Sequence, residues 1–276
     1  MPRILDYTGQ DVTRTVTVRS IVEHKGRTPP LTQVTTATAE EAAAAEAAGV
    51  DMGICLSDFV ADVRQGSSKL FLTAAIDFSG AISDDDLLGT AYEALQNGAD
   101  AVITARRLQA LERIASEDIP VMGHLGFVPK KSTLYGGVRA VGKTADEAED
   151  LWQQFRRLED AGAFAVECEL IPERVMREIH QRTSLATISL GSGRFADAVF
   201  LFMSDICGES AHIPKHARVY TDLPALQTKV QAARTDALRA YCNDVKDGSY
   251  PGGAEVADID DNELSTFLER LDNDAR

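Results

Sequence analysis

The sequence has few of the features that mark membrane proteins, secreted proteins or cysteine-rich metal sites. No apolar run approaches the roughly 20 residues that a membrane-spanning helix needs, and the start, MPRILDYTGQDV, lacks the apolar core of a signal peptide. The four cysteines are scattered, with no CxxC pair and no zinc-type spacing. We therefore expect a cytoplasmic protein with reduced thiols and no membrane partner.

Positive charge is also scarce, because 28 Lys and Arg residues stand against 43 Asp and Glu residues. The formal net charge of −15 argues against nucleic acid or an anionic membrane surface as a partner. Part of the excess lies in residues 254–276, which hold eight acidic residues and two arginines. Blocks of like charge usually mark solvated surface, so we expect an acidic tail with a short helix and no chemistry.

Short runs rich in β-formers alternate with amphipathic stretches along most of the 276 residues. The expected strands are 30–36, 51–57, 69–77, 100–105, 119–126, 164–170, 185–191 and 197–203. Eight strands, most of them separated by helices, predict an α/β fold with a parallel sheet closed into a (β/α)8 TIM barrel. An open doubly wound sheet is the alternative, although no G-x-G-x-x-G turn follows the first strand.

Local signals predict where some helices begin. Ser83 precedes three aspartates, and Thr144 with Glu147 has the spacing of a capping box. After the barrel, apolar positions recur at helical spacing over 223–248, so this helix must lie against the barrel wall or another subunit. We expect a single domain over 1–253, made of the barrel and this additional C-terminal helix, followed by the acidic tail.

Polar residues gather where the expected strands end, and the active site of such a barrel lies at the carboxyl ends of its strands. These residues are Thr35, Thr36, Ser57, Asp58, Asp77, Arg106, Arg107, His124, Glu169 and the loop 191–197. Together they predict a pocket for a small anionic ligand. In the loop, GSG offers backbone N–H groups and Arg194 offers a fork that fits a carboxylate or phosphate.

Several of these candidates have alternatives that the sequence leaves open. His124 lies between glycines in PVMGHLGFVP (120–129), either as a core histidine bonded to a carbonyl or as a residue that faces a ligand. Strand alternation puts Glu167 and Glu169 on one face, and an inward carboxylate is costly unless it is paired or functional. We therefore expect a functional role for one of these two glutamates. Asp58 and Asp77 either cap local structure or serve the site.

Several ordered motifs resemble those of one family. Residues 119–172 contain a Pro-Val-Met-Gly-His turn, a Gly-Gly and Gly-x-Thr loop, and Ala-Gly-Ala-Phe before the sixth strand. ISLGSGRFADAVFLFMSD (188–205) and TVTVRSIVEHKGR (15–27) add to the similarity, which runs from about Val16 to Gly253. These stretches resemble the ketopantoate hydroxymethyltransferase (3-methyl-2-oxobutanoate hydroxymethyltransferase) family, in the barrel superfamily of phosphoenolpyruvate mutase and isocitrate lyase.

The resemblance implies an aldol-type transfer in pantothenate biosynthesis by a large homo-oligomer. A divalent metal, usually Mg²⁺, chelates a small 2-oxo acid, and the enolate takes a one-carbon unit from methylenetetrahydrofolate. By this resemblance Glu169 falls on the family's catalytic glutamate and His124 on its turn histidine. Asp77 falls on or beside the second metal-binding aspartate. The family's first metal-binding aspartate falls on Ser57 in an ungapped alignment and on Asp58 after a shift of one residue.

The chain also departs from the family pattern. Ile103 and Ala105 stand where the family has a lysine and a metal-linked glutamate, and the loop before the third strand is shorter. The leading hypothesis is an enzyme that makes or breaks a carbon–carbon bond through an enolate. Its catalytic residues would be Glu169 and His124, its metal ligands Asp58 and Asp77, and its substrate-binding residues Ser57, Arg106, Arg194 and Ser192, with Arg107 as a further candidate. The alternatives are a non-catalytic relative that binds or assembles, and a folate-independent lyase or decarboxylase.

Overall fold

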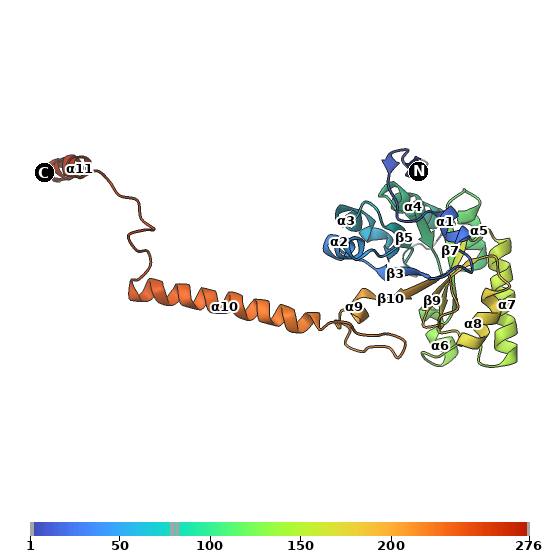
Figure 1. Ribbon diagram of the computed structural model, residues 1–276. Coiled ribbons are helices and arrows are strands. Elements are labelled where there is room, and N and C mark those ends of the chain that lie inside the picture. The colour runs from blue at the N-terminus through green and yellow to red at the C-terminus, as the bar shows by residue number, and fades with distance from the viewer. Residues whose placement is uncertain (1–2, 78–79, 81–82, 275–276) are drawn as a thin grey trace. The chain divides into compact units, whose positions relative to one another are not determined.

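Eight parallel strands form a closed barrel in the computed structural model, which describes residues 3–77, 80 and 83–274 (Figure 1). The strands are β3 (Leu31–Thr35), β4 (Met52–Leu56), β5 (Phe71–Ala75), β6 (Ala101–Ile103), β7 (Val121–Gly126), β8 (Ala165–Glu169), β9 (Ala186–Leu190) and β10 (Ala198–Leu201). Each pairs with the next along the chain, and β10 pairs with β3 to close the sheet. The predicted (β/α)8 barrel is therefore confirmed, and the open doubly wound sheet is excluded.

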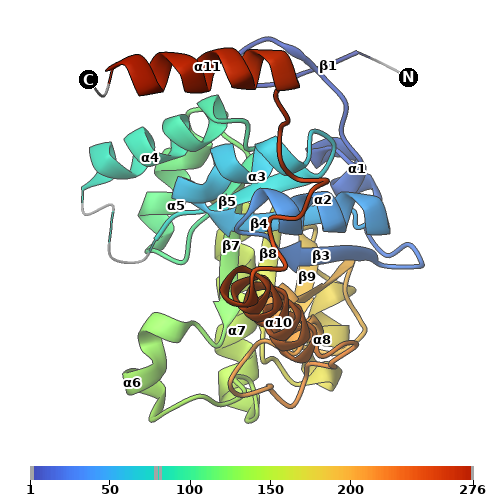
Figure 2. The ribbon, with the colours of Figure 1, turned by 90° about the vertical axis from the view of Figure 1, so that its left-hand side faces the viewer.

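Helices surround this barrel, with α2 to α5 on one side of the strands and α7 and α8 on the other (Figure 2). Their bounds are α1 (Val18–Glu23), α2 (Ala39–Ala48), α3 (Val60–Gly66), α4 (Asp84–Gln96), α5 (Leu108–Ala115), α6 (Ser132–Tyr135), α7 (Ala145–Asp160), α8 (Glu173–His180) and α9 (Met203–Ile206). Two short 3-10 turns are η1 (Ser57–Phe59) and η2 (Pro129–Lys131), and β1 (Ile4–Leu5) pairs with β2 (Asp11–Val12) ahead of the barrel. β9 runs directly into β10 through the loop 191–197.

Strand alternation divides the core into two layers. Phe71 of β5 packs inside the barrel, whereas its neighbour Leu72 packs outward in the layer between strands and helices. On β8 the inward positions are Ala165, Glu167 and Glu169, because side chains two residues apart share a face. The inside is therefore apolar at the amino end of β8 and acidic toward its carboxyl end.

Side-chain caps fix the start of α4 and α7 as the sequence predicts. Ser83 accepts a hydrogen bond from the Asp86 N–H, and Thr144 accepts one from the Glu147 N–H. The second half of the predicted capping box at α7 is replaced, because the Glu147 carboxylate accepts from the N–H groups of Gly142 and Lys143 instead. Glu147 thereby fixes the loop that leads into α7.

The chain divides into two units, residues 1–221 and residues 222–276. The second unit contains α10 (Leu223–Asp247), which is the helix expected over 223–248, and α11 (Asp261–Asp274) in the acidic tail. Helical spacing reveals an apolar face but not what covers it, so the single domain over 1–253 stays a prediction. In the described part of the chain, no helix is long and apolar enough to cross a membrane.

A buried aspartate joins the last two strands to the N-terminal segment. Asp197 is 1 % exposed, and its Oδ2 accepts from the N–H of Thr187 at 2.7 Å and from Lys25 Nζ at 3.2 Å. Its Oδ1 accepts from the Gly26 N–H at 2.7 Å. Asp197→Asn would turn an amide donor toward these donors, so we expect a loss of about 3–5 kcal/mol in the free energy of unfolding, measured with urea. The exposed Asp160→Asn is the control and should change it by less than about 0.5 kcal/mol.

The same cluster should make the barrel sensitive to acid. Burial and the charge of Lys25 lower the pKa of His180 from 6.5, so the unfolded chain takes up this proton first and stability falls as the pH drops below that value. Burial raises the pKa of Asp197, but its backbone hydrogen bonds and Lys25 outweigh this and hold it below 3.8. Its contribution is therefore lost only at lower pH. Urea unfolding at several pH values should show both decreases, and Asp197→Asn should lack the second.

Candidate active site

A cavity of about 510 Å³ opens at the carboxyl ends of the barrel strands. Its walls are mainly apolar, and its polar members are two threonines, one histidine and two glutamates. The lining residues are Thr35, Thr36, Ala37, Ile54, Cys55, Leu56, Phe59, Ala75, Ile76, Ile103, Ala105, His124, Pro129, Glu167, Glu169, Leu190, Phe200 and Phe202. This is the place where barrel enzymes carry their chemistry.

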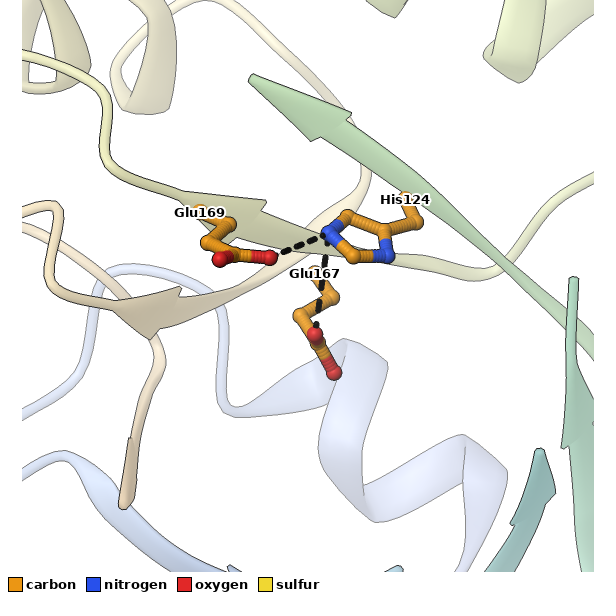
Figure 3. Close-up of side chains that lie close together, drawn as sticks. All are labelled: His124, Glu167 and Glu169. Atoms are coloured by element: carbon orange, nitrogen blue, oxygen red, sulfur yellow. Dashed lines mark hydrogen bonds and ion pairs between the residues drawn. The ribbon is translucent and has the colours of Figure 1, made fainter. Parts of the chain in front are cut away.

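Strand register brings the charged members of the cavity together. His124 of β7 pairs with Glu167 of β8, and both point inward along with Glu169, two residues further on (Figure 3). His124 Nε2 lies 3.0 Å from Glu169 Oε2 and 3.8 Å from Glu167 Oε1. Glu167 and Glu169 share one face of β8, as strand alternation predicts, and the structure brings both to the imidazole.

The electrostatics of this trio are those of groups removed from water. Burial lowers the pKa of His124, but the hydrogen bond to Glu169, the charges of both glutamates and a backbone bond to Phe127 together raise it above 6.5. Burial raises the pKa of Glu167, which is 5 % exposed, and only His124 opposes this. Glu167 Oε2 has no hydrogen-bond partner. A buried carboxylate with a bare oxygen needs either a proton or a cation.

The trio also has the composition of a metal site. One imidazole nitrogen and two carboxylate oxygens, from His124, Glu167 and Glu169, lie within 4.8 Å of one another. A hydrogen bond between His124 and the backbone of Phe127 leaves Nε2 of the ring facing the carboxylates. In many metal sites, the second ring nitrogen of a ligating histidine is held by a backbone carbonyl in the same way. Among the described residues, this trio is the group of at least three metal-ligating side chains that lie close enough together to hold a metal ion.

The glycines beside His124 have packing reasons. A Cβ on Gly123 would lie 2.5 Å from Leu158 Cδ1 of α7, so glycine lets the helix close on the strand. Gly126 has φ +86°, and a Cβ there would lie 2.2 Å from the carbonyl oxygen of Glu169. Because Gly126 has no Cβ, β7 can turn away directly beside the end of β8. The two glycines thus hold His124 and Glu169 side by side.

The predicted metal pair does not reach the cavity. Asp58 and Asp77 are exposed, and neither is among the lining residues. Ser57 is buried in η1, donates to Asp58 Oδ1 at 3.2 Å and does not line the cavity. At the end of β5 the lining positions are instead Ala75 and Ile76, because the strand ends at Ala75 and its alternation does not extend to Asp77. Their placement does not support the prediction for Asp58 and Asp77.

The predicted substrate-binding residues are spread over several places. Ser192 is buried, and its hydroxyl donates to the Cys168 carbonyl and accepts from the Ile171 N–H, so both of its bonding roles serve the end of β8. Arg194 is exposed and pairs with Glu173 at 3.2 Å. Arg106 lies beside the mouth, in a smaller neighbouring cavity that also has Ala105 and His124 in its wall. Of these candidates, Arg106 is the one placed next to the trio.

Other lining residues had weaker signals in the sequence. Thr36 is 1 % exposed, and its hydroxyl, which has no hydrogen-bond partner, lies against Gly53 on the outer side of the strands. Cys55 also lines the cavity, but burial raises the pKa of its thiol to about 12, which keeps it neutral and unreactive. Ile103 and Ala105, at the positions where the resemblance expects a lysine and a glutamate, do face the cavity and make its wall apolar.

Solved structures support the fold. A putative phosphonomutase from Burkholderia cenocepacia superposes with a TM-score of 0.54 at 11% identity, covering 80% of this chain and 100% of that one. Phosphonopyruvate hydrolase, solved in complex with oxalate and Mg²⁺, gives a TM-score of 0.50 at 12% identity over 94% of this chain and 98% of that one. At such low identity these similarities establish the barrel and leave the chemistry to the site.

Sequence comparison identifies the family. The model of ketopantoate hydroxymethyltransferase matches residues 56–253. A 3-methyl-2-oxobutanoate hydroxymethyltransferase from Pyrobaculum islandicum is 32% identical over 207 residues, covering 72% of this chain and 77% of that protein. One from Kosmotoga olearia is 29% identical over 265 residues, covering 87% and 96%. The chain therefore belongs to the ketopantoate hydroxymethyltransferase family.

Proposed function

We propose that this protein forms or breaks a carbon–carbon bond at C3 of a small 2-oxo acid, through an enolate, in the cavity at the barrel mouth. The observation that carries the proposal is the convergence of His124, Glu167 and Glu169 inside an otherwise apolar cavity, in a chain whose relatives are named 3-methyl-2-oxobutanoate hydroxymethyltransferases. Apolar walls suit the aliphatic part of such a substrate and limit the access of water.

The charges of this site are better balanced with a bound divalent cation, Mg²⁺ by preference, than without one. Two glutamates repel the carboxylate of a 2-oxo acid, and Ile103 supplies no positive charge where the family has a lysine. His124, Glu167 and Glu169 would hold the cation, and the bare oxygen of Glu167 is the observation that favours it. When bound, the cation polarises the 2-oxo carbonyl and stabilises an enolate. This assignment replaces Asp58 and Asp77 as the proposed ligands.

The remaining chemistry is assigned to residues of this chain. Glu169 takes the proton from C3 during bond formation, or returns it during cleavage, because its carboxylate lines the cavity and only Oε2 is engaged by His124. In the metal-free site His124 Nε2 holds that carboxylate through a 3.0 Å hydrogen bond, and a cation would take the place of this hydrogen bond between the two groups.

The finer properties implied by the resemblance stay proposals. We propose a homo-oligomer that works in the cytoplasm, as expected for the family. A methylene derivative of tetrahydrofolate as one-carbon donor remains a prediction, and the proposed enolate is common to the transferase and to a folate-independent lyase or decarboxylase. Product analysis with and without the folate separates these reactions.

Calorimetry tests the proposed site directly. Titration of Mg²⁺ or Mn²⁺ in the presence of 3-methyl-2-oxobutanoate should show binding in the micromolar range, since substrate oxygens complete the coordination shell of a hard cation. Titration of the 2-oxo acid without metal should show much weaker binding. Silence toward metal in the presence of the 2-oxo acid would instead identify a non-catalytic relative.

A further inference from the structure

A second, smaller cavity of about 170 Å³ lies next to the mouth. Ala105 and His124 line both cavities, so the two are direct neighbours. The smaller one extends from the ends of β6 and β7 toward α5 and α7, where Leu111 and Leu158 close it. Typical ligand pockets enclose roughly 300–1,000 Å³, so this space suits one chemical group of a ligand and not a whole ligand.

Four basic side chains line this cavity, and within the described part of the chain no carboxylate does. They are Arg106, Arg107, Lys131 and Arg157. Arg107 is 62 % exposed and pairs with Asp84 at 3.0 Å, whereas Lys131 and Arg157 form no ion pair with a described residue. In a chain of net charge −15, this local excess of positive charge needs a reason.

Two further features favour an anion here. Burial, together with the nearby charges of Lys131 and Arg106, lowers the pKa of Lys130, as expected where cations lie close together. Helix α5 begins beside the cavity, its N-cap Arg107 makes no capping hydrogen bond, and its first turn has no acidic residue. Within the described residues, neither a side-chain cap nor an acidic residue in the first turn compensates the positive end of this helix.

We infer that this cavity is a subsite for an anionic group, a phosphate or a carboxylate, carried by the ligand whose 2-oxo acid portion lies at the barrel mouth. The ligand therefore has a second anionic group besides the carboxylate of its 2-oxo acid. Lys131 and Arg157 bind that group, with Arg106 beside it. This choice of ligand rests on the proposed function, whereas the subsite itself rests on the cavity and its charges.

Inorganic phosphate tests the subsite without any substrate. We expect Lys131→Gln and Arg157→Gln each to weaken phosphate binding by roughly tenfold or more, because a hydrogen bond to a charged group contributes about 1.5–3 kcal/mol. The matched control is Arg156→Gln, which removes an exposed cation from the neighbouring position of α7 that does not line the cavity. Both variant sites are on the surface side of the cavity, and thermal unfolding checks that the fold is kept. Equal phosphate affinity in all four proteins would overturn the subsite.

A comparison of substrates tests what the subsite selects. In the presence of Mg²⁺, 2-oxoglutarate or a 2-oxo acid with a terminal phosphonate should bind at least about tenfold more tightly than 3-methyl-2-oxobutanoate, and Arg157→Gln should remove that preference. Whichever of these two compounds binds more tightly shows whether the subsite prefers a carboxylate or a phosphate-like group. If phosphate binds as expected but the second anion brings no preference, the ligand assignment is wrong. If no 2-oxo acid binds although phosphate does, the proposed function fails and the subsite stands.

Discussion

Glu169→Gln is expected to lower turnover by about 100- to 10,000-fold, the range that loss of a positioned acid or base produces. Glutamine keeps the length and shape of the side chain and can still bond to His124, but it cannot accept a proton from C3. The residue is partly exposed at the mouth and its neighbours on β8 are unchanged, so we expect no large change in thermal stability. Steady-state kinetics on the 2-oxo acid that binds best gives the measurement.

Glu173→Gln is the matched control for this variant. Glu173 lies at the start of α8, pairs with Arg194 and does not line the mouth cavity. We expect turnover within about twofold of the unchanged protein. Full activity of Glu169→Gln would remove Glu169 from the mechanism, whereas an equal loss in both variants would point to a general disturbance of this end of the barrel.

Glu167→Gln should abolish binding of the divalent cation while leaving the fold at least as stable. Losing a residue that merely supports a ligand reduces metal affinity about 10- to 100-fold, so losing a ligand should weaken affinity by more than about 100-fold. Without metal, Glu167 is a buried carboxylate with one bare oxygen, and the neutral amide of glutamine removes the cost of burying that charge. We expect calorimetry to show the loss and urea unfolding to show no destabilisation of the metal-free protein.

This pair of measurements separates two roles for Glu167. A metal ligand predicts lost metal binding with stability unchanged or improved. A residue that only holds β7 and β8 together through His124 predicts the opposite, a large loss of stability with metal affinity unchanged. The second result would contradict the proposed trio, because it would show that Glu167 serves the barrel wall.

Much of the fold follows from the sequence alone. Most strands of this barrel are buried on both faces, so strands such as KLFLTAAID appear as short apolar runs between amphipathic helices, and their number and order predict closure. What covers a helix is a different matter. The apolar spacing over 223–248 predicts a helix, as α10 confirms, but its grouping with residues 222–276 depends on contacts that no periodicity encodes.

Strand alternation predicts the part of the candidate site that lies within the strands. Alternation put Glu167 and Glu169 on one face, and the turn after β7 marked His124, so all three were open to sequence reasoning. Asp58 and Asp77 show the limit, because β4 ends at Leu56 and β5 at Ala75, and the turns that follow carry both side chains to the solvent. Ser192 shows another, since a loop serine looks like a ligand donor until its partners at Cys168 and Ile171 are known.

Anomalous scattering from a crystal soaked with Mn²⁺ and 3-methyl-2-oxobutanoate is the most direct test of the trio as a metal site. Mn²⁺ favours the same oxygen-rich ligands as Mg²⁺ and can be located without ambiguity by its own signal. We predict one strong peak within coordination distance of His124 Nε2 and of carboxylate oxygens of Glu167 and Glu169. A peak beside Asp58 or Asp77, with none at the trio, would contradict the proposal.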